Sequence, residues 1–276
     1  MPYRHEALFY DGVDDLVITA LPFIRAGLDA GEPVLVAARP DSPLRSLDGI
    51  AFVEIPRNPA QIIPLWRNFV EAHDGPVRGI GEPIWAGRDG DELVECQLHE
   101  SLLNVAFDED FTLLCPYDIA SLDEAVIHEA RCSHPVIDGD PSHVYRDAPL
   151  PLAPFAPPPP GARLLAFDLD SLAELRDFVA AHGGDPDFVL AVDELATNSI
   201  RHGGGRGIVR LWSDDGALVC EVRDQGQIAD PLAGRRRPAA DVFGGRGLWI
   251  TNQVCDLVQI RPGAVRVRSA LARPPV

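Results

Sequence analysis

A run of prolines divides this chain and limits what it can fold into. Residues 148–161 read APLPLAPFAPPPPG, in which seven of fourteen residues are proline. Proline has no backbone N–H and clashes with a preceding helical turn, so the segment can form neither a helix nor a central strand. We expect a stiff polyproline-II spacer with ~3.1 Å per residue. The sequence therefore predicts an N-terminal domain over residues 1–147, a linker over residues 148–161 and a C-terminal domain over residues 162–276.

The composition is that of a globular protein with reduced thiols. With 276 residues, of which 46% are hydrophobic, each domain is large enough to bury its own core. No apolar stretch approaches the ~20 residues of a membrane-spanning helix, and the N-terminus lacks the pattern of a signal peptide. The five cysteines are scattered and form no CxxC pair. We therefore expect a cytoplasmic protein without membrane contact.

The charged residues exclude several classes of function. All 24 basic residues are arginine, so the chain can contain no P-loop lysine, catalytic lysine or Schiff base. Residues 1–147 hold 27 acidic residues and 10 arginines, a net charge of 10 − 27 = −17. Residues 148–276 hold 15 acidic residues and 14 arginines, a net charge of 14 − 15 = −1. Because an acidic domain repels phosphates, we expect no direct binding of nucleic acid.

The N-terminal domain alternates short apolar runs with amphipathic helical patterns. This alternation predicts a doubly wound or RecA-like α/β sheet. The predicted strands cover residues 7–10, 33–37, 51–55, 77–81 and 111–115, and the predicted helices cover residues 13–30, 59–73, 91–106 and 122–132. Neither GxGxxG nor GxxxxGK[ST] occurs, so the usual nucleotide fingerprints are absent.

One group of residues in this domain has the types that bind metals. His128 and Cys132 share a predicted helix face, His134 follows, and Cys115 ends the preceding strand. A structural zinc site needs four close ligands, and free cysteines are mostly small buried apolar residues. The pattern favours packing, with a metal at His128, Cys132 and His134 as the alternative.

Several short motifs of the N-terminal half occur in a recognisable order. They are HEALFY at residues 5–10, a helix end at residues 23–32, RGxGEPxW at residues 78–85, Glu100-x3-Asn104, CPYD at residues 115–118 and His134-Pro135. Together they resemble the MEDS sensory domain over about residues 5–137. The resemblance implies a ligand-sensing module related to RecA/KaiC-type folds without their P-loop. It does not imply which small molecule or protein supplies the signal.

The C-terminal domain segregates its helices from its strands, which predicts an α/β sandwich with a mixed or antiparallel sheet. In its central predicted helix Glu194, Asn198 and His202 are four residues apart and share one face. Asn198 offers a neutral oxygen to Mg²⁺, and Glu194 could take a proton from an attacking hydroxyl. For His202, near the helix end, a packing or capping role is favoured.

Two further motifs follow in order. Asp224 ends a strand and could accept from an exocyclic amine, while Gly226 lets the backbone approach a flat base. The run Gly245-Arg246-Gly247-Leu248 opens a helix whose free N–H groups can bind phosphates. Residues 235–237, three arginines, are interpreted equally well as a solvated loop or as a contact to the γ-phosphate or an acidic partner. Each motif is weak alone, but the ordered set is much more specific.

Over about residues 163–270 these motifs resemble the GHKL (Bergerat-fold) ATPases, and within them the anti-sigma-factor serine kinases. The resemblance implies ATP and Mg²⁺ as cofactors, with Glu194 as general base and Asn198 as the Mg²⁺ ligand. It also makes Asp224 and Gly226 the adenine-binding motif and residues 245–248 the second glycine motif. One position departs from the family pattern D-x-G-x-G, because Ile228 stands where the second glycine belongs.

The sequence therefore predicts an Mg-ATP-dependent serine kinase that phosphorylates an anti-sigma-factor antagonist. It would bind or release a sigma factor accordingly, under control of the N-terminal domain. A non-catalytic nucleotide-binding switch is the alternative that Ile228 supports. A sensor histidine kinase is less favoured, because the chain has no room for a dimerising hairpin with a phosphoacceptor histidine. Whether the protein forms a homodimer is left open.

Overall fold

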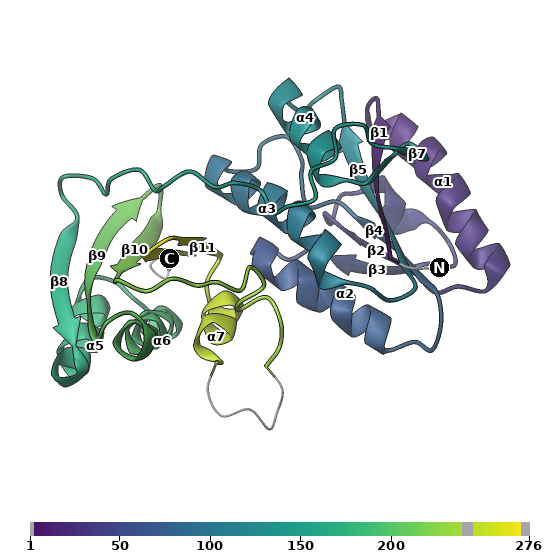
Figure 1. Cartoon of the computed structure of the whole chain (residues 1–276). Coiled ribbons are helices and arrows are strands. Elements are labelled where there is room, and N and C mark those ends of the chain that lie inside the picture. Colours follow the sequence, from purple (N-terminus) through teal and green to yellow (C-terminus); the bar gives the residue numbers. More distant parts are fainter. Residues whose placement is uncertain (1–2, 239–244, 272–276) are drawn as a thin grey trace. The chain divides into compact units, whose positions relative to one another are not determined.

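The computed structural model describes residues 3–238 and 245–271. The chain separates into two compact units, residues 1–150 and 151–276, each with its own sheet (Figure 1). None of the described helices combines the length and the apolar character that crossing a membrane requires.

The first unit contains a seven-stranded sheet of order β3-β2-β4-β5-β1-β6-β7, in which every neighbouring pair except β6–β7 is parallel. Burial on both faces explains why strands such as β2 are apolar throughout. The strands are β1 (Arg4–Tyr10), β2 (Val34–Ala38), β3 (Ala51–Glu54), β4 (Val77–Gly81), β5 (Phe111–Asp118), β6 (Val136–Ile137) and β7 (Asp140–Pro141).

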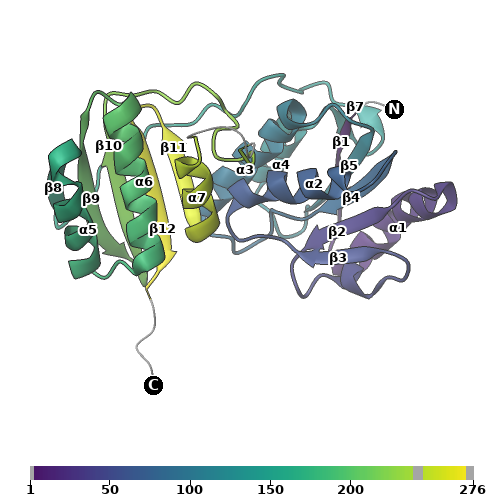
Figure 2. The same cartoon turned by 90° about the horizontal axis from the view of Figure 1, so that it is seen from below.

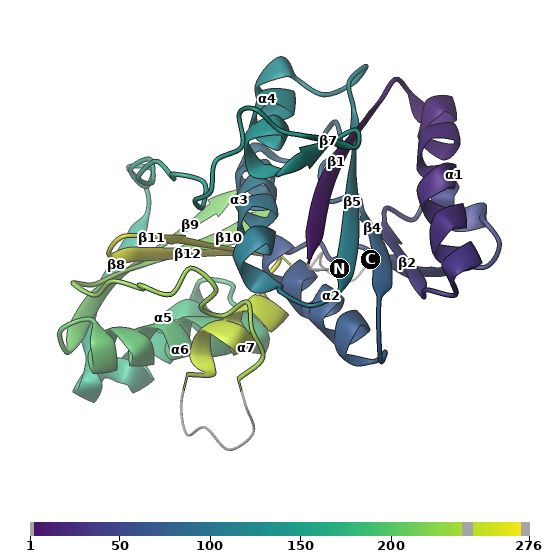
Figure 3. The same ribbon diagram turned by 45° about the vertical axis from the view of Figure 1, so that its right-hand side comes forward.

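Helices cover both faces of this sheet, with α1 on one face and α2, α3 and α4 on the other (Figure 3). They are α1 (Val13–Ala30), α2 (Ile62–Glu71), α3 (Gly90–Ala106) and α4 (Glu124–Ser133), with the short 3₁₀ helices η1 (Pro43–Ser46) and η2 (Pro59–Gln61). Helix α1 ends where the sequence predicts, because Gly31 adopts the left-handed conformation (φ 71°) that stops a helix. The predicted helix over residues 59–73 instead begins as η2 and becomes α-helical only at Ile62.

The second unit contains a five-stranded antiparallel sheet of order β11-β12-β10-β9-β8, which decides between the mixed and antiparallel expectations. Helices α5, α6 and α7 lie side by side on one face of it (Figure 2). The strands are β8 (Arg163–Asp168), β9 (Arg206–Asp214), β10 (Ala217–Arg223), β11 (Leu257–Arg261) and β12 (Ala264–Ala270), and the helices are η3 (Leu169–Ser171), α5 (Leu172–Ala181), α6 (Pro186–His202) and α7 (Gly247–Val254).

Part of the predicted linker is attached to the second unit. The Phe155 ring lies under two guanidinium groups, 4.9 Å from that of Arg261 and 4.3 Å from that of Arg266. Arg261 Nε donates to the carbonyl of Ala153 (3.0 Å), and Arg266 donates to the carbonyl of Ala156. Residues 153–156 are therefore packed against the second unit and do not only link the two domains. They form neither a helix nor a strand, as the prolines predict.

Next to this packed segment, the buried carboxylate of Glu221 is paired with arginines. It accepts hydrogen bonds from Arg223 (2.5 Å) and Arg266 (2.9 Å) and lies 3.5 Å from Arg210. Burial raises the pKa of Glu221, but the hydrogen bonds and charges of Arg223 and Arg266 outweigh it and hold the pKa below the ordinary 4.5.

We predict that Glu221→Ala lowers the free energy of unfolding by ~2 kcal/mol, because the arginines lose their buried partner but remain partly hydrated. The depressed pKa gives stability that is present above the unfolded-state pKa and is lost as the pH falls through the folded-state pKa. Urea denaturation followed by circular dichroism at neutral and acidic pH measures both effects. The exposed Glu174→Ala on α5 is the control, and an equal loss in both variants would contradict the prediction.

Candidate functional site

A cavity of about 440 Å³ lies within the second unit and brings together most of the predicted site residues. This volume is within the range of small-molecule sites. Six of the nine predicted residues line it, namely Asn198, His202, Asp224, Gly226, Gly245 and Leu248. Its apolar wall includes Leu195 of α6, Val222 of β10 and Val265 of β12. The remaining three, Glu194, Arg246 and Gly247, are outside this lining.

Helix α6 fixes the positions of Glu194 and Asn198. The helix begins where the Asp185 side chain accepts the Phe188 N–H (2.8 Å) and Pro186 occupies the first turn, both residue types that favour a helix start. Its apolar face is buried in the core of the second unit. Glu194 and Asn198 are half-buried on the side that faces α7.

Gly247, the first residue of α7, packs directly on both of these side chains. A Cβ atom at Gly247 would lie 2.8 Å from Glu194 Oε2 and 2.9 Å from Asn198 Nδ2. Only glycine permits so close an approach. The start of α7, with its free N–H groups, therefore lies against the carboxylate and the carboxamide. Asn198 lines the cavity, and Gly247 contacts both Asn198 and Glu194, so Gly247 and Glu194 lie just behind the cavity wall.

We predict that Gly247→Ala weakens the binding of Mg-ATP, the ligand that the family resemblance implies, by at least about tenfold, because the new methyl group must displace Glu194 and Asn198. Alanine stabilises a helix by ~1 kcal/mol relative to glycine, so helix propensity alone would stabilise α7 in this variant. A loss of affinity would therefore not come from a weaker helix. Calorimetric titration measures the affinity. Gly161→Ala, whose Cβ meets nothing within 4 Å, is the matched control. Unchanged affinity in Gly247→Ala would contradict this account of the contact.

The loop after β10 holds Asp224 in a fixed orientation. Asp224 Oδ1 accepts the Gly226 N–H (2.6 Å), and the Asp224 N–H donates to Gly263 O (3.2 Å). Gly203 lies so close that a Cβ there would be 2.4 Å from Asp224 Cγ. Among the described residues Oδ2 has no hydrogen-bond partner, so it is available to accept from a ligand amine. Sequence reasoning missed the contact of Gly203, although the run of three glycines that ends α6 was a signal for it.

The loop keeps an ordinary backbone at Ile228. Among the described residues only Asp138 and Asp215 combine a side chain with a positive φ, so Ile228 is not forced into the conformation that glycine favours. Its side chain is 42% exposed and lines the cavity. The departure from the family pattern therefore adds an apolar group to the cavity wall without backbone strain.

The remaining predicted residues have different environments. His202 is exposed in the last turn of α6, where it lines the cavity. Arg246 is exposed and immediately precedes α7. The three arginines at 235–237 do not act as one loop, because Arg235 is buried, Arg236 lines the cavity and Arg237 is exposed.

The metal site considered at His128, Cys132 and His134 is not assembled in the described chain. Cys132 Sγ lies 3.7 Å from His128 Nε2, whereas His134 Nε2 lies 3.1 Å from Glu100 Oε2 on another helix. The reason is that His134 follows the end of α4 and no longer continues its helical face.

Comparison with known families agrees with the two resemblances. Residues 4–135 match the model of MEDS, the methanogen/methylotroph, DcmR sensory domain. Residues 165–269 match the model of the histidine kinase-like ATPase domain. A search of curated proteins found no match. The chain joins an N-terminal MEDS domain to a C-terminal histidine kinase-like ATPase domain of the GHKL type.

Proposed function

We propose that this protein is a signal-responsive regulator of transcription that acts as an Mg-ATP-dependent protein serine kinase. Its substrate is an anti-sigma-factor antagonist, and the phosphorylation state of that antagonist decides whether a sigma factor is held or released. The MEDS domain, for which we also propose a RecA/KaiC-like fold, controls the activity in response to a small-molecule or protein signal. The proposed location is the cytoplasm.

The observation that carries this proposal is the joint contact of Glu194 and Asn198 with Gly247, beside a cavity that also contains Asp224. A hydrated Mg²⁺ ion requires an oxygen ligand, which the Asn198 carboxamide supplies. The phosphates require N–H donors, which the start of α7 supplies. An adenine amine requires an acceptor, which Asp224 Oδ2 supplies. The residues present therefore fit Mg-ATP.

The chain's own groups account for the chemistry of transfer. Mg-ATP, when bound, would supply the phosphoryl group, and its Mg²⁺ ion would neutralise negative charge on the phosphates. Glu194 accepts the proton of the serine hydroxyl, and Asn198 positions the metal ion. Gly247 lets the start of α7 pack directly on both of these side chains, because it has no Cβ atom.

A second candidate is a switch that binds nucleotide and sequesters a partner without transfer. Ile228 favours it, because this apolar side chain lines the cavity where the kinase pattern has glycine. A sensor histidine kinase is disfavoured, since the described residues between β7 and β8 contain no helix that could carry a phosphoacceptor histidine.

Incubation of the full chain with labelled Mg-ATP and a candidate antagonist tests the proposal. Acid-stable phosphoserine on the antagonist is the expected result. Nucleotide binding without transfer to any antagonist tested would replace the kinase with the switch. Acid-labile autophosphorylation would overturn both in favour of a histidine kinase.

A further inference from the structure

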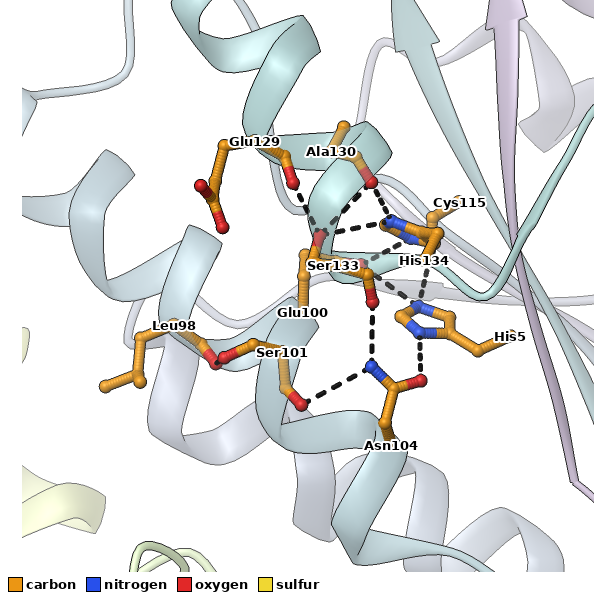
Figure 4. A network of polar contacts seen from close by, with 10 residues as sticks. All are labelled: His5, Leu98, Glu100, Ser101, Asn104, Cys115, Glu129, Ala130, Ser133 and His134. Carbon is orange, nitrogen blue, oxygen red and sulfur yellow. Dashed lines mark hydrogen bonds and ion pairs between the residues drawn. The ribbon is translucent and has the colours of Figure 1, made fainter. Parts of the chain in front are cut away.

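Four side chains of the MEDS domain converge in its interior, far from one another in sequence (Figure 4). His5 lies on β1, Cys115 on β5 and Glu100 on α3, and His134 is the residue that follows α4. All four are at most 1% exposed. Strands β1 and β5 are parallel neighbours with Ala7 opposite Cys115, and alternate residues share a face, so His5 and Cys115 both point to the same side of the sheet.

The spacing of these groups is that of ligands around one ion. One ligand atom from each residue lies within 4.8 Å of all the others. Glu100 Oε2 is 3.2 Å from His5 Nε2 and 3.1 Å from His134 Nε2, and Cys115 Sγ is 3.4 Å from His5 Nε2. Tetrahedral bonds to zinc of ~2.0–2.3 Å place neighbouring ligand atoms roughly 3.4–3.6 Å apart. These three distances differ from the tetrahedral values by a few tenths of an ångström, and the remaining pairs of ligand atoms lie within 4.8 Å.

Hydrogen bonds outside the cluster fix the direction of both imidazoles. His134 Nδ1 is 2.7 Å from the carbonyl oxygen of Ala130, and His5 Nδ1 is 3.1 Å from Asn104 Oδ1. The Asn104 amide nitrogen donates to Ser133 O (2.7 Å), so its oxygen is the atom that faces His5. Carbonyl oxygens only accept, and both Nδ1 atoms therefore carry protons. This arrangement directs both Nε2 atoms into the cluster, as in histidines that bind metals.

The charges of the cluster are incomplete without a cation. Because both Nδ1 atoms carry protons, each imidazole in its neutral form presents an Nε2 lone pair to the Glu100 carboxylate, and neither atom can donate to the other. Glu100 Oε1 and Tyr117 Oη, both buried, also have no hydrogen-bond partner within the described chain. Two neutral imidazoles, one carboxylate and one thiolate would balance a divalent ion, leaving no net charge in the interior.

We propose that His5, Glu100, Cys115 and His134 bind one divalent transition-metal ion. This set of nitrogen, oxygen and sulfur donors favours zinc. Binding releases the Cys115 thiol proton to solvent and forms a metal–sulfur bond without any change of oxidation state. With four protein ligands the site is closed. The ion therefore ties β1, β5, α3 and the end of α4 together as a structural centre of the sensory domain, independently of the ATPase proposal.

Elemental analysis of the purified full chain, refolded with Zn²⁺, tests this proposal. We expect about one zinc per chain and, after Co²⁺ substitution, a thiolate-to-cobalt charge-transfer band. Cys115→Ser should lose the band and most of the metal, whereas Cys132→Ser should keep both. His134→Ala and His128→Ala form the second matched pair, since His128 lies on the same helix but outside the cluster.

A measurement on the unaltered chain covers the case in which a variant fails to fold. Adding Zn²⁺ to the chelator-treated wild-type protein should raise its Tm in a concentration-dependent way, because only the folded state has the assembled site. Folded wild-type protein that retains no metal and gains no thermal stability with Zn²⁺ or Co²⁺ would overturn the proposal. Equal metal content in Cys115→Ser and Cys132→Ser, both folded, would overturn it as well.

Discussion

Replacing Glu194 with glutamine is expected to slow phosphoryl transfer by roughly 10²–10⁴-fold, the usual contribution of a general base. Glutamine has nearly the same shape and keeps the packing against Gly247, but its amide cannot take a proton from the serine hydroxyl. Because Glu194 is not among the residues that line the cavity, we expect the affinity for Mg-ATP to change little. The variant therefore separates catalysis from binding.

Single-turnover transfer from labelled Mg-ATP to the antagonist measures this effect, and calorimetry on the same sample measures the affinity. Glu174→Gln is the matched control, because Glu174 is an exposed glutamate on α5, away from the cavity. Full transfer by Glu194→Gln would refute the general-base assignment. Loss of binding together with transfer would make Glu194 a residue that holds the nucleotide instead.

Asp224→Asn is expected to weaken Mg-ATP binding by roughly 30–150-fold, which corresponds to about 2–3 kcal/mol for a hydrogen bond to a charged acceptor. Asparagine can still accept the Gly226 N–H through its remaining oxygen, so the loop should keep its shape. The other position becomes an NH₂ group, which meets the amine of the base as donor against donor. The loss therefore reports on base recognition and not on folding.

Calorimetric titration with Mg-ATP checks this prediction. Asp214→Asn, which lies exposed at the end of β9, is the control and should bind as the wild type does. If Asp224→Asn binds with unchanged affinity, the base is held elsewhere. The apolar side chain of Ile228, which lines the same cavity, would then be the first group to examine.

The elements and the central site motif were predictable because their signals are local. The spacing of Glu194 and Asn198, together with the cap at Asp185 and Pro186, defines α6 from neighbouring residues alone. The contact of Gly247 with both side chains was not readable, since it depends on how α7 packs on α6. Likewise, the sequence could place Ile228 at a family position but could not show that its backbone is unstrained.

Features that depend on pairing across the fold escaped prediction. The β6–β7 hairpin consists of two-residue strands, too short for a periodic pattern. His5 and Cys115 are 110 residues apart, and only the parallel pairing of β1 with β5 places them together. The sequence suggested metal ligands at His128, Cys132 and His134, because nearness along the chain and helical spacing are what a local pattern reveals. The tertiary fold groups His134 with different residues.

Titration of the full chain with Mg-ATP tests the central claim, that the cavity beside Glu194 and Asn198 is an ATP site, most directly. The account predicts saturable binding with about one site per chain, weaker without Mg²⁺ and strongly reduced by Asp224→Asn. Folded wild-type protein that shows no binding of Mg-ATP, or binding that Asp224→Asn and Gly247→Ala leave intact, would contradict it.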